Sequence, residues 1–163
     1  MQSPHAGPLP GSYWVRPGRL LAGSYPSSAF DPTLTQERLA RLLDAGVTFF
    51  LDLTEPGERE LYMPFLPEGV EHQRFAIPDM HTPDHALMSM ILDTIDTILD
   101  DGRTIYLHCW GGIGRTGTVA GCYLVRHGMT GQEALAEIAR RRHAGSPETD
   151  EQRWMVEHWR EDS

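Results

Sequence analysis

The stretch of sequence that decides the fold is His108-Cys109-Trp110-Gly111-Gly112-Ile113-Gly114-Arg115-Thr116-Gly117. It follows Thr104–His108, whose apolar and β-branched residues predict a buried strand, and it leads into residues 115–126, whose pattern indicates a helix. Glycines between a strand and a helix let successive backbone N–H groups turn to one side, where the positive end of the helix also points. The segment therefore predicts a loop that binds an anion.

Three side chains give this loop a chemistry. Amide donors and a helix N-terminus favour a thiolate over a thiol, so Cys109 is the candidate nucleophile. Arg115 ends the loop, and its planar guanidinium can hold two oxygens of a phosphoryl group, a geometry that lysine cannot copy. The hydroxyl of Thr116 can donate to the sulfur and make Cys109 a better leaving group. Cys122, within the following helix, is interpreted as a small core residue and not as a redox partner.

His108, Cys109, Arg115 and Thr116 match the pattern His-Cys-x5-Arg-Ser/Thr. With them the sequence resembles the cysteine-dependent protein tyrosine phosphatase superfamily, and in particular its small, atypical dual-specificity branch. The resemblance implies that Cys109 is the nucleophile and that His108 orders the loop. It also implies that phosphate is bound by the Arg115 side chain and by the backbone amides of Trp110, Gly111, Gly112, Ile113, Gly114 and Arg115.

A phosphatase of this kind needs a proton donor for the leaving oxygen, a role usually worth roughly 10²–10⁴ in rate. In proteins that this chain resembles, an aspartate on a movable loop upstream of the cysteine fills the role. Asp79 lies 30 residues before Cys109 and Asp84 lies 25 residues before it. Thr82-Pro83 predicts a helix start with Asp84 in the first turn, where a carboxylate already has a structural role, so Asp79 is preferred. The segment lacks the Trp-Pro-Asp sequence of the larger tyrosine-specific enzymes.

Two further groups of polar residues allow alternatives. Gln152 resembles the glutamine with which some relatives place the attacking water, but it also fits a capping box opened by Thr149, which is the preferred interpretation. The arginines at positions 140–142 either frame the entrance of the site or form a solvated helix end, and the second interpretation is preferred.

Outside the loop, strands and helices alternate along the chain. Strands are predicted at 13–15, 20–22, 47–52 and 71–77, and helices at about 31–45, 82–102, 130–142 and 149–159. This alternation predicts an α/β fold, a single domain with a central, largely parallel sheet flanked by helices. Residues 1–12, rich in Pro and Gly, predict a flexible N-terminal arm, and residues 13–163 form the expected phosphatase domain.

Composition limits the functions that the chain can have. The net charge of −9 and the lack of a basic run oppose nucleic-acid binding. No apolar run approaches the ~20 residues that cross a bilayer, and no signal peptide opens the chain, so a cytoplasmic monomer without membrane contact is expected. Two cysteines do not make a disulfide framework, and the eight histidines show no zinc-type spacing. No metal or other cofactor is expected.

The sequence thus predicts a phosphatase that hydrolyses phosphate monoesters through a phosphocysteine. The loop between Cys109 and Arg115 has no lysine, unlike phosphoinositide-directed relatives, so phosphotyrosine and then phosphoserine or phosphothreonine in proteins are the first substrates. Inositol phosphates, phosphoinositides and nucleotides are the alternative. A rhodanese-like sulfurtransferase shares a cysteine in an amide-lined loop, but Arg115-Thr116 and Asp79 argue against it. A phosphate-binding module without catalysis would not need the nucleophile.

Overall fold

A five-stranded sheet forms the centre of the molecule, in a computed structural model that describes residues 4–28 and 30–162. Its strands are β1 (Tyr13–Arg16), β2 (Leu20–Gly23), β3 (Val47–Asp52), β4 (Glu71–Arg74) and β5 (Thr104–His108). Their order across the sheet is β1-β2-β5-β3-β4. β1 is antiparallel to β2, and the other neighbours pair in parallel. The predicted single-domain α/β fold with a largely parallel sheet is confirmed.

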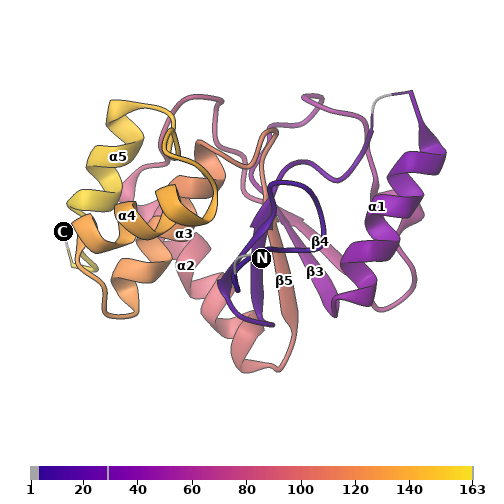
Figure 1. The fold of residues 1–163 in the computed structure, drawn as a ribbon, viewed down its shortest axis with the longest axis horizontal. Helices are drawn as coiled ribbons and strands as arrows, with labels where there is room; N and C mark the ends of the chain where they lie inside the picture. Colours follow the sequence, from indigo (N-terminus) through magenta and orange to yellow (C-terminus); the bar gives the residue numbers. More distant parts are fainter. Residues whose placement is uncertain (1–3, 29, 163) are drawn as a thin grey trace.

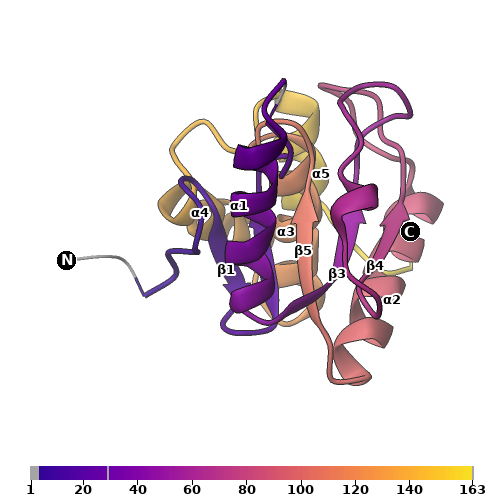
Figure 2. The ribbon, with the colours of Figure 1, turned by 90° about the vertical axis from the view of Figure 1, so that its right-hand side faces the viewer.

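Helices cover both faces of this sheet (Figure 1). α1 (Pro32–Asp44) lies on one face, which Figure 2 views from the outside. α2 (His85–Asp100) and α3 (Arg115–Arg126) cover the other face, and α4 (Gly131–Arg141) and α5 (Asp150–Glu157) pack against α3; a short 3₁₀ helix, η1, spans Met63–Phe65. None of the helices in the described ranges is both long and apolar enough to cross a membrane.

Alternation along the strands divides the apolar side chains between two cores. Ile105 and Leu107 of β5 pack into the core beneath α2 and α3, whereas Tyr106 between them packs with Leu39 and Leu42 of α1. Successive side chains of a strand point to opposite faces of the sheet, so a strand buried on both sides reads as a continuous apolar run. β5 is therefore rigidly held at the point where it enters the cysteine-containing loop.

The helix caps follow the sequence with one exception. Both predicted capping boxes form, at the starts of α4 and α5. The predicted helix start at residue 82 is wrong, because the Thr82 hydroxyl donates to Glu151 at 2.7 Å instead of capping a helix. α2 begins at His85, and Asp84 is its N-cap, accepting a hydrogen bond from the Leu87 amide at 2.8 Å. Asp84 thus has a structural role, although not in the first turn.

The segment before β1 folds back along that strand. The Trp14 amide donates to the His5 carbonyl at 2.7 Å, and the Gly7 amide donates to the Ser12 carbonyl at 2.9 Å. Leu9 is buried against the core of α1. Residues 1–3 lie outside the described residues, and the flexibility expected of residues 1–12 stays a prediction.

Candidate active site

The segment Cys109–Gly114, here called the cysteine loop, connects the end of β5 to the start of α3. Its carbonyl oxygens accept hydrogen bonds from groups outside the loop. The donors are the Tyr25 amide to Trp110 (2.9 Å), Arg142 Nη2 to Gly111 (3.2 Å), Ser146 Oγ to Ile113 (2.8 Å) and the Thr118 amide to Gly114 (2.9 Å). The outer side of the loop is therefore tied to several separate parts of the molecule.

These anchors determine where the amide groups of the loop point. In a planar trans peptide the N–H is directed opposite to the C=O, so each outward carbonyl turns the next amide inward. Within residues 4–28 and 30–162, none of the amides from Trp110 to Gly114 donates a hydrogen bond to the protein. Backbone amides that are partly buried need an acceptor. The loop thus presents a set of free donors toward one point, a geometry suited to an anion.

Gly112 is the residue on which this backbone path depends. Its φ is +73°, and a Cβ at this position would lie 2.5 Å from the carbonyl carbon of Gly23. Gly111 differs, since a Cβ there would meet only the Ile113 side chain at 3.8 Å, an ordinary contact. A side chain is therefore excluded at position 112 by both backbone conformation and space.

Cys109 begins this loop and Thr116 follows it, and both side chains are buried. Cys109 is 3% exposed, and burial raises the pKa of the Tyr13 and Tyr106 hydroxyls near it. Thr116 is fully buried, and its Oγ1 has no hydrogen-bond partner in the described parts of the chain. A buried hydroxyl without a partner is costly unless something else accepts its proton, and this hydroxyl belongs to the second residue after the loop.

Arg115 is almost completely buried and is held by an acid that sequence reasoning missed. Its Nη1 and Nη2 donate to the two carboxylate oxygens of Glu58 at 3.0 and 2.8 Å, and Nη1 also donates to the Ile77 carbonyl at 2.9 Å. A guanidinium has five N–H donors. The Nε–H of Arg115 is buried without a partner among the described residues, so this edge of the fork remains available to an anion.

The charges of Arg115 and Glu58 stabilise each other. Burial alone would lower the pKa of Arg115, but the hydrogen bonds to Glu58 and the nearby Cys109 and Asp79 raise it. Burial alone would raise the pKa of Glu58, but the hydrogen bond from Arg115 lowers it. Arg115 therefore keeps its charge, and Glu58 fixes the plane of the guanidinium. Glu58 follows a buried parallel strand, and this position at the carboxyl edge of the sheet was the available signal.

Asp79 lies beside Arg115, with Oδ1 3.4 Å from Nη2, and its side chain is 58% exposed. The same oxygen accepts a hydrogen bond from the Met80 amide at 3.0 Å. Asp84 caps α2, and it makes no hydrogen bond or ion pair with Arg115 in the described parts of the chain. Of the two candidate acids, the structure brings Asp79 to the loop.

His108 contacts the backbone at the start of the cysteine loop. Its Nδ1 lies 3.3 Å from the Cys109 carbonyl, and its Nε2 lies 2.6 Å from the Tyr62 hydroxyl. A carbonyl can only accept, so Nδ1 carries the proton and Nε2 accepts from Tyr62. Burial lowers the pKa of His108 to about 4, against a smaller opposing effect of Asp52. The imidazole is thus neutral at pH 7 and orders the backbone next to Cys109.

The arginines at the end of α4 do not form the single solvated helix end that was preferred from sequence. Arg140 does lie in solvent beside Glu137. Arg141 Nη1 donates to the Val15 carbonyl of β1 at 2.9 Å, and Arg142 Nη2 donates to the Gly111 carbonyl. The interpretation is wrong for these two residues because their neighbours come from β1 and from the cysteine loop, which local sequence does not reveal.

The remaining candidate residues have separate places. Gln152 forms the predicted capping box, and its Nε2 donates to the His81 carbonyl at 3.3 Å. Trp110 is half exposed at the rim of the loop, with the Arg59 guanidinium 4.8 Å from its ring centroid. Cys122 is buried in α3, and burial raises the pKa of its thiol. No group of three potential metal ligands occurs in the described part of the chain.

An α/β sheet that ends in a Cys-x5-Arg loop with inward amides defines a protein of the cysteine-based tyrosine phosphatase superfamily. Residues 27–129 match the family described as "Polymorphic toxin system, DSP-PTPase phosphatase" (Tc-R-P), a range that contains Asp79, Cys109 and Arg115. The chain belongs to this family of small phosphatases of the dual-specificity type.

Named relatives agree with this assignment. The chain is 37% identical over 73 residues to the dual specificity protein phosphatase CDC14B of Mus musculus, covering 44% of this chain and 14% of that protein. It is 30% identical over 145 residues to protein 067L of Invertebrate iridescent virus 3, which is named as a tyrosine phosphatase, covering 85% of this chain and 56% of that protein. The chain therefore spans only part of the length of these relatives.

Solved structures show the same fold. Tk-PTP in its active form superposes with a TM-score of 0.76 and 28% identity, over 90% of this chain and 93% of that one. The core catalytic domain of the PP-IP phosphatase SIW14 from S. cerevisiae superposes with a TM-score of 0.73 at 18% identity, over 97% of this chain and 90% of that one. The second likeness supports the fold alone.

Proposed function

We propose that this phosphatase hydrolyses phosphate monoesters of proteins, phosphotyrosine first and phosphoserine or phosphothreonine as further substrates, through a phosphocysteine on Cys109. The observation that supports this most is the run of amides from Trp110 to Gly114 without acceptors among the described residues, which follows Cys109 and ends at the buried Arg115. A phosphoryl group carries most of its charge on the oxygens that such donors can reach, and fixed donors stabilise that charge without reorganisation.

In the first step the Cys109 thiolate attacks phosphorus in line with the leaving oxygen. The S–P bond forms, the P–O bond to the substrate breaks, and Asp79 gives its proton to the leaving oxygen. The inward amides and the free Nε–H edge of Arg115 hold the three equatorial oxygens. The position of Asp79 beside Arg115 supports this role, because the acid must stand on the side opposite the sulfur.

In the second step water breaks the phosphocysteine. Asp79, now ionised, takes a proton from the attacking water, the new P–O bond forms, and the S–P bond breaks to return the thiolate of Cys109. The Thr116 hydroxyl donates to the departing sulfur, a role that its unpartnered and buried Oγ1 supports. Phosphate then leaves the loop. No metal ion is required by these steps, because the positive charge comes from Arg115 and the amides.

A second substrate class, phosphoinositides, has one observation in its favour. A relative from Arabidopsis thaliana, 28% identical over 120 residues, is named as both a phosphatidylinositol 3,4,5-trisphosphate 3-phosphatase and a protein-tyrosine-phosphatase. Against a polyanionic substrate, none of the 14 basic residues of this chain is lysine, and residues 110–114 contain no basic side chain. A phosphoprotein with a single phosphoryl group is therefore preferred.

The proposed function is tested by phosphate release from 4-nitrophenyl phosphate in the presence of EDTA. Cys109→Ser should lower kcat by roughly 10⁴-fold or more, because a serine hydroxyl is a much weaker nucleophile than the thiolate that forms the covalent bond. Cys122→Ser is the matched control and should retain activity, provided that its thermal unfolding is unchanged.

Rapid acid quenching with mass spectrometry should detect a phosphoryl group on Cys109 in wild type. Full activity of Cys109→Ser, or activity that EDTA removes, would contradict the mechanism. Transfer of sulfur from thiosulfate to cyanide, which gives thiocyanate and sulfite, without phosphatase activity would assign the loop to sulfur transfer. A panel of phosphotyrosine, phosphoserine, phosphoinositide and nucleotide substrates then ranks the substrate classes.

A further inference from the structure

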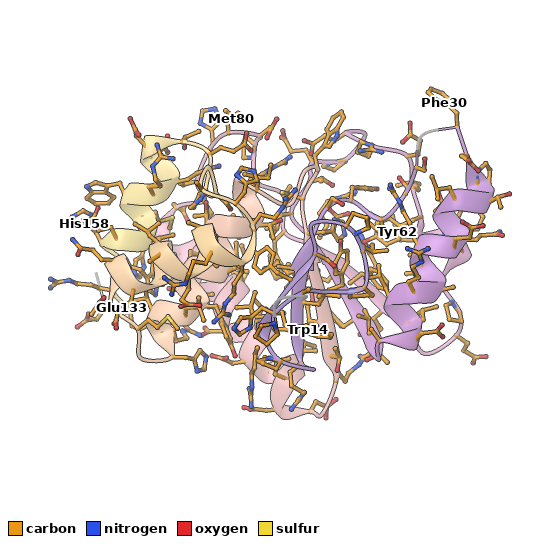
Figure 3. All side chains as sticks on the ribbon, viewed as in Figure 1. Trp14, Phe30, Tyr62, Met80, Glu133 and His158 are labelled. Atoms are coloured by element: carbon orange, nitrogen blue, oxygen red, sulfur yellow. The ribbon has the colours of Figure 1, made fainter. Side chains whose placement is uncertain are left out.

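Large apolar side chains are exposed around the cysteine loop. Seven large hydrophobic residues of the described chain are exposed, and two of them, Met90 and Trp154, lie on α2 and α5. The other five belong to segments near the loop: Phe30, Leu61, Phe65, Met80 and Trp110. Figure 3 shows Phe30 and Met80 along the same upper edge of the molecule, Phe30 on the side of α1 and Met80 toward α5. Single exposed apolar residues are ordinary, but a group next to a reaction site marks a binding surface.

Phe30, Leu61 and Phe65 form a contiguous surface, here called the apolar patch. They line one hollow together with Ser27, Glu60 and the start of α1. Their exposed fractions are 97%, 55% and 38%. Removing these three large apolar side chains from water would be favourable, and a partner that covers the hollow would do so.

Backbone conformation holds apolar side chains outward on both sides of the loop. Phe30 and Met80 are the non-glycine residues with positive φ in residues 4–28 and 30–162, at +65° and +69°. Bulky residues avoid this region, and such outliers persist where function requires them. Met80 follows Asp79, which contacts Arg115, whereas Phe30 belongs to the apolar patch. The two unusual positions therefore both hold exposed hydrophobic side chains, one beside the proposed acid and one in the apolar patch.

The chain from Glu58 to Leu61 connects the reaction site to the apolar patch. Glu58 holds Arg115, and Leu61, three residues later, lies in the patch. Three residues span at most roughly 10 Å, so the Cα atom of Leu61 lies within about that distance of the Cα atom of Glu58. A substrate peptide of about the same number of residues would extend from the cysteine loop to the apolar patch.

Arg59 and Glu60, the two residues between Glu58 and Leu61, are held by several contacts. The Arg59 guanidinium lies 4.8 Å from the ring centroid of Trp110 and 5.1 Å from that of Tyr25. The Glu60 carbonyl accepts hydrogen bonds from the Tyr25 hydroxyl at 2.8 Å and from Ser27 Oγ at 3.3 Å. The hollow is thus at a fixed distance from the cysteine loop, as a site that reads one substrate position requires.

We propose that the apolar patch binds a large apolar side chain of the phosphorylated protein, about three residues away from the phosphorylated residue. This inference rests on the proposed function, because the patch can select only a chain whose phosphoryl group enters the cysteine loop. A protein segment is favoured over an anionic membrane surface because Asp31 and Glu60 line the hollow and the net charge is −9.

The test compares two synthetic phosphotyrosine peptides that differ in one side chain, leucine or serine, about three residues from the phosphotyrosine. Each pair is made with the variable residue before and after the phosphotyrosine. In one of these orientations wild type should hydrolyse the leucine peptide with a kcat/KM about tenfold higher, since burial of one such side chain is worth about this factor. This measurement needs no variant and therefore no assumption about folding.

Substitutions then assign the preference to the patch. Phe30→Ser, Leu61→Ser and Phe65→Ser should reduce the preference for the leucine peptide toward unity. Met90→Ser, which changes a 56% exposed side chain on α2, is the matched control and should keep it. Hydrolysis of 4-nitrophenyl phosphate, which is too small to reach the patch, should stay within about twofold in the three patch variants.

The outcomes separate this inference from the proposed function. Hydrolysis of 4-nitrophenyl phosphate by wild type without discrimination between the peptides overturns the inference alone, whereas no hydrolysis of any phosphate ester overturns both. The inference is also contradicted if the patch variants lose kcat/KM equally on the leucine and serine peptides. If light scattering shows a wild-type dimer that Phe30→Ser dissociates without changing peptide preference, the patch joins copies of the chain. Loss of vesicle binding in the same variants would assign it to a membrane.

Discussion

The cysteine loop and the segment Pro78–Pro83, here called the aspartate loop, lie next to each other but are held in different ways. The carbonyls of the cysteine loop are tied to groups from three separate parts of the chain: Tyr25, Arg142 and Ser146. In the aspartate loop, four consecutive residues from Pro78 to His81 are exposed. Among the residues that the structure describes, its hydrogen bonds and ion pairs to other elements come from the Asp79 side chain, the His81 carbonyl and the Thr82 hydroxyl.

The difference separates two requirements of the proposed reaction. Hydrogen-bond donors stabilise the charge that develops in the transition state most effectively when they are fixed before the reaction begins. A proton donor must meet leaving groups of different shapes, and a loop with few contacts can open and close around them. The anion site therefore belongs to the rigid part of the molecule and the acid to a part with more freedom.

The largest expected effect comes from breaking the rigid side of this comparison. Gly112→Ala forces a Cβ against the Gly23 backbone and out of the left-handed region, so the inward amides must turn. We expect kcat/KM on 4-nitrophenyl phosphate to fall by roughly 10³-fold, as when fixed donors are removed from an oxyanion site. Gly111→Ala is the matched control, with a much smaller loss, and equal losses in both variants would contradict the assigned backbone geometry.

A smaller effect is expected from a change in the aspartate loop. Asp79→Asn should lower kcat by roughly 10²–10³-fold for alkyl phosphates and less for 4-nitrophenyl phosphate, whose leaving group needs little protonation. The proposed acid acts when protonated, so wild-type kcat/KM should decline on the alkaline side of its optimum and the variant should lose this decline. Asp84→Ala is the control.

For Asp84→Ala we expect unchanged kcat and a loss of about 1 kcal/mol in the free energy of unfolding, because it removes only the cap of α2. Kinetics over a pH series and urea unfolding measure the two effects. A loss of kcat in Asp84→Ala that exceeds the loss in Asp79→Asn would transfer the role of the acid to Asp84.

The smallest expected effect is on the free energy of unfolding. It concerns His108, which contacts the cysteine loop and not the aspartate loop. Folded His108 has a pKa of about 4, below its value in the unfolded chain, so the unfolded chain binds a proton first as the pH falls. The stabilisation is complete above about pH 6.5 and is lost toward pH 4, at a cost of up to roughly 3 kcal/mol.

Urea unfolding of wild type and His108→Gln between pH 7 and pH 4 measures this contribution. The variant should be less stable at pH 7, because it loses the contact with Tyr62, but its stability should change less over this interval. Parallel curves for the two proteins would show that His108 does not titrate as inferred. Asp79→Asn, on the exposed loop, should follow the wild-type curve.

Sequence alone identified the parts of the site that are close together in the chain. The strand, the glycines, Cys109 and Arg115 fall within one short stretch, and their order determines a strand, a turn and a helix start. The capping boxes at Thr130 and Thr149 were predictable for the same reason. The choice of Asp79 over Asp84 followed from reasoning about a helix cap, although the cap proved to be Asp84 itself.

Glu58 and Arg142 could not be found in this way. Glu58 is 57 positions from Arg115, and Arg142 is 31 positions from Gly111. The chain contains 23 acidic and 14 basic residues, and the one signal for Glu58, its place after a buried parallel strand, is shared by Glu55. Thr82 is a similar case, since its contact with Glu151 displaced a helix start that the sequence favoured.

The chemistry of the reactive loop, the alternation of strands and helices and most helix ends were determined by the amino-acid sequence itself, because each depends on residues within a few positions of one another. Which carboxylate orients Arg115, which arginine holds the Gly111 carbonyl and which apolar side chains surround the site were decided only by the tertiary structure. The physical reason is that charged and exposed side chains carry no local signal of their partner, which is selected by the packing of distant elements.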